Sequence, residues 1–281
     1  MRVHVRVPGS TANLGPGFDV LAAALGLHLD LEVVQTGTFA VVTDLDLRRD
    51  RENLVVRAFE RLHPAEGFEF RIRSEIPLSG GVGSSAAGVV AGLMAAAHVL
   101  DQGADILALA TELEGHPDNV AASLIGGLVI CDGVEAHPAP LPDELEGVLV
   151  VPSAPVSTAL ARAALPETVP LADAVRNMAQ ISKLVLGLAS SDWDLIAGGL
   201  HDRLHQPYRT HLYPDSAAIL DLAPEIGALG ATISGAGPTV LVWCRRPDTA
   251  RVVAALEPEV RDWARVLSVA FAQRGAQLVS G

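Results

Sequence analysis

The segment Pro77-Leu78-Ser79-Gly80-Gly81-Val82-Gly83-Ser84-Ser85-Ala86-Ala87 decides how the rest of the chain is interpreted. It follows an alternating, strand-like stretch at 68–74 and opens an apolar, helical stretch at 84–100. Three glycines in four positions allow backbone turns that other residues avoid, and they remove the Cβ atoms that would hold an anion away. Ser84 or Ser85 can cap the helix, whose first N–H groups carry the positive end of its dipole. The segment predicts a phosphate-binding loop, with a glycine-rich turn that only caps a core helix as the alternative.

The two best-known phosphate loops are excluded by the sequence. A Walker A loop needs a lysine directly before its Ser or Thr, and Lys183, the single lysine of the chain, lies about a hundred residues away. A Rossmann turn needs GxGxxG with a matching acidic residue, which is missing. Main-chain amides and a metal ion are therefore expected to hold the phosphates. A second glycine-rich segment, 234–239, has the same character, with a tight hairpin turn as its alternative.

Composition limits the kind of partner. The net charge of −13 over 281 residues disfavours nucleic acid and anionic membrane surfaces. The most apolar stretch, 86–100, is shorter than the ~20 residues that cross a bilayer. Residues 1–7 alternate like a strand and do not form the apolar region of a signal peptide. Cys131 and Cys244 stand far apart, with no zinc or disulfide pattern. We expect a cytoplasmic protein without membrane or nucleic-acid partners.

The order of elements predicts an α+β protein of two domains, 1–151 and 152–281, because strands and helices do not alternate strictly. The boundary is set after a proline-rich stretch, 132–143, and a strand at 147–151. The other predicted strands are 2–8, 28–35, 38–43, 68–74, 128–131, 231–234, 239–244 and 266–270. The predicted helices are 53–62, 84–100, 105–114, 118–124, 158–164, 171–189, 192–205, 216–223 and 247–256.

A third motif makes the interpretation specific. The segment Pro8-Gly9-Ser10-Thr11-Ala12-Asn13-Leu14-Gly15-Pro16-Gly17-Phe18-Asp19, together with the two glycine-rich segments, resembles the GHMP kinase superfamily, and within it the homoserine kinases. The resemblance implies an N-terminal domain of ribosomal-S5-domain-2 type and a ferredoxin-like C-terminal domain, with the active site between them. It also implies phosphorylation of L-homoserine by ATP and Mg²⁺ to O-phospho-L-homoserine in threonine biosynthesis, by a homodimer.

The resemblance also implies which residues bind the nucleotide and its metal ion. Glu112 matches a Mg²⁺-binding glutamate of the family beside Ser84 or Ser85, and a solvated helix carboxylate is its alternative. Asn53 matches an adenine-contacting asparagine, with a helix cap as its alternative. The ATP site as a whole is expected to consist of Asn53, Pro77, Leu78, Ser79, Gly80, Gly81, Val82, Gly83, Ser84, Ser85, Ala86, Ala87, Gly235 and Gly237.

For the acceptor, the resemblance implies a second set of residues. Arg162 and Arg209 match arginines that grip the substrate α-carboxylate, since a guanidinium can meet a carboxylate through two hydrogen bonds. The full expected substrate site is Asn13, Asp19, His116, Asn119, Arg162 and Arg209, with Asp19 facing the ammonium group. Taken singly, either arginine is more often part of a surface ion pair.

The catalytic residues implied are Asn119, Asp19 and His116. Asn119 stands where some relatives have a catalytic aspartate, and an amide cannot accept the substrate proton. The hydroxyl proton is therefore expected to pass to the γ-phosphate, with Asp19 or Asp118 as the alternative base. If the helix before it continued, His116 would share a face with Glu112. The rival functions are a kinase for another alcohol, such as mevalonate, and a non-catalytic nucleotide-binding regulator.

Overall fold

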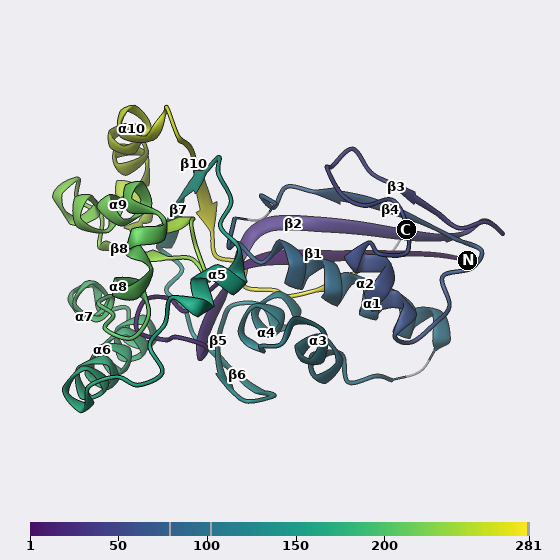
Figure 1. The fold of residues 1–281 in the computed structure, drawn as a ribbon, viewed down its shortest axis with the longest axis horizontal. Coiled ribbons are helices and arrows are strands. Elements are labelled where there is room, and N and C mark those ends of the chain that lie inside the picture. Colours follow the sequence, from purple (N-terminus) through teal and green to yellow (C-terminus); the bar gives the residue numbers. More distant parts are fainter. Residues whose placement is uncertain (79, 102, 280–281) are drawn as a thin grey trace.

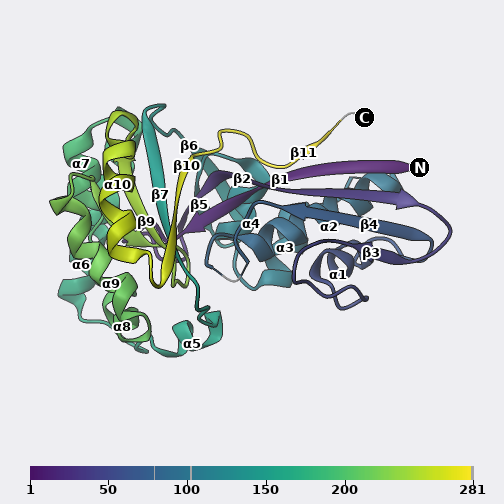
Figure 2. The same ribbon diagram turned by 90° about the horizontal axis from the view of Figure 1, so that it is seen from above.

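A computed structural model describes residues 1–78, 80–101 and 103–279. It consists of two parts that lie side by side, each built on its own sheet (Figures 1 and 2). No helix within these ranges is long and apolar enough to span a membrane.

The first sheet carries the long strands at the N-terminus. Its described strands run in the order β11-β1-β2-β4-β3, and β5 pairs with the start of β2 and carries β6. Their bounds are β1 (Arg2–Ala12), β2 (Leu21–Gln35), β3 (Ala40–Val42), β4 (Phe68–Ser74), β5 (Leu128–Asp132), β6 (Glu135–Ala139) and β11 (Gln277–Leu278). Four helices belong to this part, namely α1 (Leu54–Glu60), α2 (Ser84–Leu100), α3 (Ile106–Glu114) and α4 (Asp118–Ile125).

Small residues let these helices pack closely, as a core of Ala, Val and Leu predicts. Helix α2 lies against β1 and β2 and packs beside α1. An added Cβ at Gly92 of α2 would overlap the Val55 carbonyl oxygen of α1. In β1, Val3, Val5 and Val7 are buried, whereas the charged residues between them are at least partly exposed. The period of two therefore arises from a strand with one buried face.

The second sheet is antiparallel, with the order β10-β7-β9-β8. Its strands are β7 (Leu145–Pro152), β8 (Gly230–Ile233), β9 (Val240–Arg245) and β10 (Ala264–Ala270). The accompanying helices are α5 (Thr158–Ala163), α6 (Leu171–Ser190), α7 (Trp193–Gly199), α8 (Gln206–Arg209), η1 (Thr210–Leu212), α9 (Pro214–Glu225), η2 (Arg246–Asp248) and α10 (Thr249–Val260). Helices α9 and α10 enclose a second core, which includes Ile219, Val242 and Leu256.

The predicted domain boundary at 151/152 is wrong, because it cuts through β7. Pairing decides membership of a sheet, and β7 pairs with β9 and β10, so the second part begins before Leu145. The end of the chain returns to the first part. Gly127 N donates to Ala272 O (2.7 Å), and β11 pairs with β1.

The predicted helix over 192–205 is also wrong at its end, since α7 stops at Gly199. There the backbone approaches α6 so closely that a Cβ on Gly199 would lie 2.6 Å from Leu184 N. In the turn that follows, the Asp202 carboxylate accepts hydrogen bonds from the backbone N–H groups of Leu204, His205 and Gln206. This turn leads directly into α8.

Candidate active site

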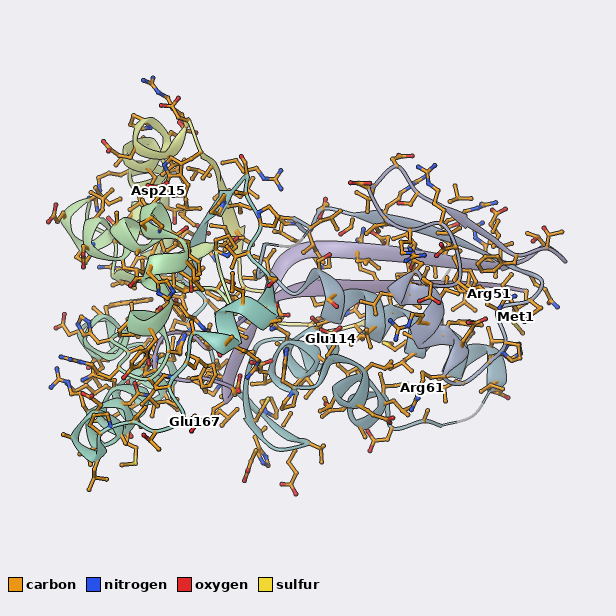
Figure 3. The ribbon with its side chains drawn as sticks, in the orientation of Figure 1. Met1, Arg51, Arg61, Glu114, Glu167 and Asp215 are labelled. Atoms are coloured by element: carbon orange, nitrogen blue, oxygen red, sulfur yellow. The ribbon has the colours of Figure 1, made fainter. Side chains whose placement is uncertain are left out.

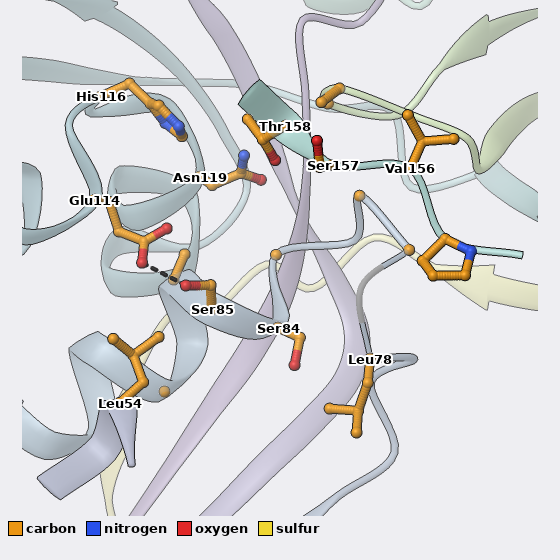
Figure 4. A pocket seen from close by; sticks show the side chains of 18 of the residues that line it. Leu54, Leu78, Ser84, Ser85, Glu114, His116, Asn119, Val156, Ser157 and Thr158 are labelled. Carbon is orange, nitrogen blue, oxygen red and sulfur yellow. Dashed lines mark hydrogen bonds between the residues drawn. The ribbon is translucent and has the colours of Figure 1, made fainter. Parts of the chain in front are cut away.

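A cavity of about 1090 Å³ lies between the two parts, and both parts contribute to its lining. The first part contributes the glycine loop and the turn before α4. The second contributes residues 155–158, Arg162, Arg209 and the β8–β9 hairpin. Figure 4 shows a pocket from close by, with side chains from the start of α2, the turn before α4 and the 156–158 segment.

The glycine loop connects β4 to α2, as predicted. Gly83 is the N-cap of α2 in the left-handed region (φ 70°), and no side chain caps the helix. The expectation that Ser84 or Ser85 caps the helix is wrong, because the helix begins at Ser84 itself. The first N–H groups of α2 therefore have no side-chain acceptor at the cap, and they adjoin the cavity. The loop residues that line it are Leu78, Gly80, Gly81, Gly83, Ser84, Ser85 and Ala86.

Three of the expected ATP residues do not line the cavity. Pro77, Val82 and Ala87 are buried behind the loop. The Val82 carbonyl accepts a hydrogen bond from Ser10 N (3.2 Å), which ties the loop to β1. Ser79 lies outside the described residues.

The second glycine-rich segment is the β8–β9 hairpin, and it packs against the first. Ser234 Oγ donates to the Gly81 carbonyl (2.7 Å), and its oxygen lies 2.8 Å from the Thr11 hydroxyl. A Cβ on Gly81 would lie 2.5 Å from the Ser234 carbonyl oxygen. Gly235 and Gly237 both line the cavity. The segment is thus a hairpin turn and part of the pocket wall at once.

The expected placement of Glu112 is wrong. Its carboxylate is exposed and pairs with Arg61 (2.7 Å), away from the cavity. Glu114, which is labelled in Figure 3, lines the cavity instead and accepts a hydrogen bond from Ser85 Oγ (Figure 4). The physical reason is the helical period, since residues two apart point to nearly opposite sides of α3.

Asn53 serves as a helix cap, which is the alternative that the sequence leaves open. Its Oδ1 accepts from Val55 N (3.0 Å), and its Nδ2 donates to the Arg48 carbonyl (2.6 Å). Asn53 nevertheless lines the cavity, next to Leu45, Leu47 and Leu54. These leucines give this end of the cavity an apolar wall, and the adenine contact of Asn53 stays a prediction.

Arg162 and Asp19, which also line the cavity, form an ion pair. Two hydrogen bonds of 2.9 and 3.1 Å join the guanidinium to the carboxylate. Asn13, in the left-handed region (φ 71°), donates from Nδ2 to Gly235 O (2.7 Å) and accepts at Oδ1 from Asp19 N (3.0 Å). Asn13 therefore joins the first motif to the β8–β9 hairpin and fixes the backbone of Asp19.

Arg209 is almost fully buried, at 1% exposure. Its hydrogen-bond acceptors are neutral, namely Ala161 O (3.0 Å), Gly235 O (3.4 Å) and His205 Nδ1 (3.1 Å). Burial is the main cause that lowers the pKa of Arg209. The Phe18 ring lies 5.3 Å from its guanidinium carbon and 5.7 Å from that of Arg162. Phe18 thus lies beside both arginines.

The turn before α4 holds the last expected residues. Helix α3 ends at Glu114, so the predicted face shared by Glu112 and His116 does not form. His116 Nδ1 instead lies 3.0 Å from Asp118 Oδ1, and this hydrogen bond raises the pKa of His116. Asn119 and His116 both line the cavity. Asp118 is buried and also accepts from Asn119 N (2.7 Å).

The structure adds residues that the sequence reasoning missed. They include Glu114, Phe18, the segment 45–48 and the segment 155–158 that leads into α5. Ser157 caps α5 by accepting from Leu160 N (3.1 Å), which is a recognisable helix-start signal. The signal shows where the helix begins, but it does not show that the start of the helix faces the glycine loop.

Comparisons with known proteins agree with this geometry. Family models for the GHMP kinases N terminal domain and the GHMP kinases C terminal match residues 53–127 and 184–260. A homoserine kinase of Moorella thermoacetica is 36% identical, with 97% of this chain and 94% of that protein covered. One from Synechococcus sp. is 41% identical, with coverages of 90% and 89%.

Solved structures give the same result. A crystal structure of homoserine kinase from Cytophaga hutchinsonii superposes with a TM-score of 0.88 at 29% identity, covering 99% of this chain and 97% of that one. A mevalonate kinase structure has a TM-score of 0.73 at 15% identity, which shows a shared fold alone. The predicted two-domain α+β fold is confirmed. The chain therefore belongs to the GHMP kinase family, in the branch that contains the homoserine kinases.

Proposed function

We propose that this kinase transfers the γ-phosphoryl group of ATP to the side-chain hydroxyl of L-homoserine, giving O-phospho-L-homoserine for threonine biosynthesis. The observation that carries the proposal is the buried Arg209. A guanidinium removed from water costs several kcal/mol unless an anion compensates it. Among the described residues no carboxylate lies within ion-pair distance of Arg209. A substrate carboxylate entering the cavity supplies the missing charge.

The Arg162–Asp19 pair fits the other charges of an amino acid. The pair is partly solvated, with exposures of 40% and 36%, so it opens at small cost. In the proposal, the substrate ammonium takes the place of Arg162 at Asp19, and the substrate carboxylate lies between Arg162 and Arg209. Binding of a zwitterionic amino acid thus replaces the Arg162–Asp19 ion pair by two others, one at its ammonium group and one at its carboxylate. An acceptor without these charges would leave Arg209 uncompensated.

The donor lies at the other end of the same cavity. Kinases of this family use ATP, and we place its triphosphate at the glycine loop, against the N-terminus of α2. Each exposed contact of an anion with a helix N-terminus contributes only ~0.3–1 kcal/mol, so several amides must act together. The adenine is placed at the leucine wall formed by Leu45, Leu47 and Leu54, next to Asn53.

Mg²⁺ fits the oxygen atoms beside the loop. The Ser85 hydroxyl and the Glu114 carboxylate already contact each other, and both are hard oxygen ligands. The described residues contain no group of three or more His, Cys, Asp or Glu side chains that could hold a metal. This agrees with an ion that takes its other ligands from phosphates and water. When bound, Mg²⁺ supplies charge neutralisation at the phosphates.

The transfer itself needs positioning and charge stabilisation more than covalent help. Asn119 and His116 line the cavity, and we place the acceptor hydroxyl beside them. The hydroxyl oxygen attacks the γ-phosphorus as the bond to the β-phosphate oxygen breaks, and the hydroxyl proton goes to a γ-phosphate oxygen. Asp118 is a poor base, because its Oδ1 already accepts from His116 and from Asn119 N.

A panel of acceptors tests the proposal through coupled ADP release. L-homoserine should give the highest kcat/KM, and 3-aminopropan-1-ol, which lacks the carboxylate, should lose roughly 10- to 150-fold for each charge-assisted contact removed. In Arg209→Met the preference for L-homoserine should shrink by the factor of one such contact, because only Arg162 is then left to bind the carboxylate, whereas the surface variant Arg265→Met should behave as wild type. A higher kcat/KM for mevalonate or a sugar would refute homoserine as the substrate. ATP binding without any turnover would instead favour a non-catalytic regulator.

A further inference from the structure

Ser10, to which the sequence assigns no role, lies where three parts of the site meet. It is fully buried in β1, at 0% exposure. Its backbone N–H holds the Val82 carbonyl of the glycine loop, and an added Cβ on Gly83 would overlap its hydroxyl oxygen. Its side chain also reaches α4. Ser10 is therefore in contact with both the phosphate loop and the helix that carries Asn119.

A short chain of hydroxyl groups ends on Asn119. Ser123 Oγ donates to Ser10 Oγ (3.1 Å), and Ser10 Oγ donates to Asn119 Oδ1 (2.9 Å). The Ser10 oxygen also lies 3.1 Å from the Asn119 carbonyl oxygen. Oδ1, the single acceptor atom of the Asn119 side chain, thus already accepts a hydrogen bond from the buried Ser10 hydroxyl.

The consequence concerns the other end of the amide. A carboxamide has one acceptor oxygen and one NH₂ group with two donors. With Oδ1 held by Ser10, Nδ2 is the atom left for the cavity that Asn119 lines, and no described residue accepts a hydrogen bond from it. We infer that Ser10 is a positioning residue that turns the Asn119 NH₂ group toward the transferring phosphoryl group. This inference rests on the proposed function.

The orientation decides what Asn119 does in the reaction. A donor aimed at an oxygen on which charge develops stabilises the transition state more than the ground state, so it acts on kcat. Ser10 touches neither substrate, and it acts through Asn119. Loss of a comparable supporting residue lowers activity about 10- to 100-fold. A purely structural role would instead disturb the loop, the nucleotide and Asn119 together.

A double-mutant cycle separates these two roles. Ser10→Ala should lower kcat about 10- to 100-fold, while the KM for ATP stays within about threefold. In the Asn119→Ala background the same substitution should change kcat less than about twofold, since there is no amide left to orient. Ser123→Ala, one step further from Asn119, should have a smaller effect. Ser182→Ala is the matched control, because Ser182 is exposed and its hydroxyl donates to Met178 O within its own helix, α6.

Two outcomes would overturn the inference. One is a wild-type kcat in Ser10→Ala, and the other is an equal loss in the presence and absence of the Asn119 amide. The melting temperature of every variant is measured. If Ser10→Ala does not fold, Ser10→Cys replaces it, because cysteine has nearly the same volume and is a weaker hydrogen-bond donor. The cycle uses whichever alcohol the wild-type enzyme phosphorylates fastest, so a failure of homoserine as substrate is seen separately. If the wild type phosphorylates no alcohol, the inference falls with the proposed function.

Discussion

Arg162 and Asp19 face each other across the acceptor end of the cavity, with Nη2 2.9 Å from Oδ1 and Nη1 3.1 Å from Oδ2. The two residues are 143 positions apart and belong to different parts of the molecule. The pair therefore joins the two parts of the molecule at the wall of the cavity. An amino acid carries both of the charges that would compete with this pair.

Asp19→Asn should weaken binding of homoserine selectively. The substitution removes the partner of the substrate ammonium, so the KM for homoserine should rise roughly 10- to 100-fold, as for loss of a charged hydrogen bond. The KM for 4-hydroxybutyrate, which has no ammonium group, should stay within about threefold. Because the pair is partly solvated, the free energy of unfolding should change by less than ~1 kcal/mol. Equal losses for both substrates in steady-state assays would contradict this assignment.

Glu114→Gln and Glu112→Gln form a matched pair two residues apart. Glu114 contacts Ser85 at the loop, so Glu114→Gln should raise the Mg²⁺ concentration that gives half-maximal activity at least tenfold, in line with the ~10- to 100-fold typical of metal-site changes. Glu112→Gln removes only an exposed pair with Arg61 and should leave that concentration unchanged. A Mg²⁺ titration of initial rates compares the two variants. The reverse order would restore Glu112 as the metal ligand.

Gly83→Ala should disturb the glycine loop and weaken nucleotide binding. Gly83 has φ 70°, and its new Cβ would overlap Ser10 Oγ, a buried atom that cannot move freely. Gly103→Ala is the control, because a Cβ there meets nothing within 4 Å. We expect Gly83→Ala to lower ATP affinity more than tenfold by calorimetry, with Gly103→Ala unchanged. Normal ATP binding in Gly83→Ala would contradict the tight loop described here.

His205 should make stability depend on pH. Burial is the main cause that lowers its pKa, and the neighbouring Arg209 acts in the same direction against the opposing effect of Asp202. The unfolded state then binds more protons below pH ~6.5, so stability is complete above that pH and falls as the pH drops. His205→Gln keeps one donor and one acceptor but does not titrate. Urea unfolding at pH 7.5 and 5.5 should show a loss in wild type that exceeds the variant's by on the order of 1 kcal/mol. Parallel losses would contradict this.

Local signals in the sequence suffice for most elements of the fold. The predicted strand over 68–74 and the predicted helix over 84–100 coincide with β4 and α2, because glycine and polar turns bound them sharply. Strand β6 (Glu135–Ala139) is missed because it contains Pro138. It pairs with β5 alone among the described strands, and such an edge strand tolerates a proline.

The site is predictable only where its residues are consecutive. The glycine loop is contiguous, so its pattern gives its place before α2. Arg162 and Arg209 come together only because α5 and α8 fold onto the first motif, and no spacing in the sequence shows this. Glu112 and Glu114 look equivalent in the sequence. Which of the two carboxylates reaches the glycine loop depends on where α3 ends and on which side of α3 faces α2. Both are features of the tertiary structure.

The pairing of β11 with β1 has a consequence for folding. The two strands lie far apart in the sequence, with the whole second sheet between them, and Arg6 pairs with Gln277. Until β11 docks, the edge of β1 that it covers is unpaired, a feature that invites association with other chains. The first sheet is therefore complete only when a segment that follows the second part has returned to it.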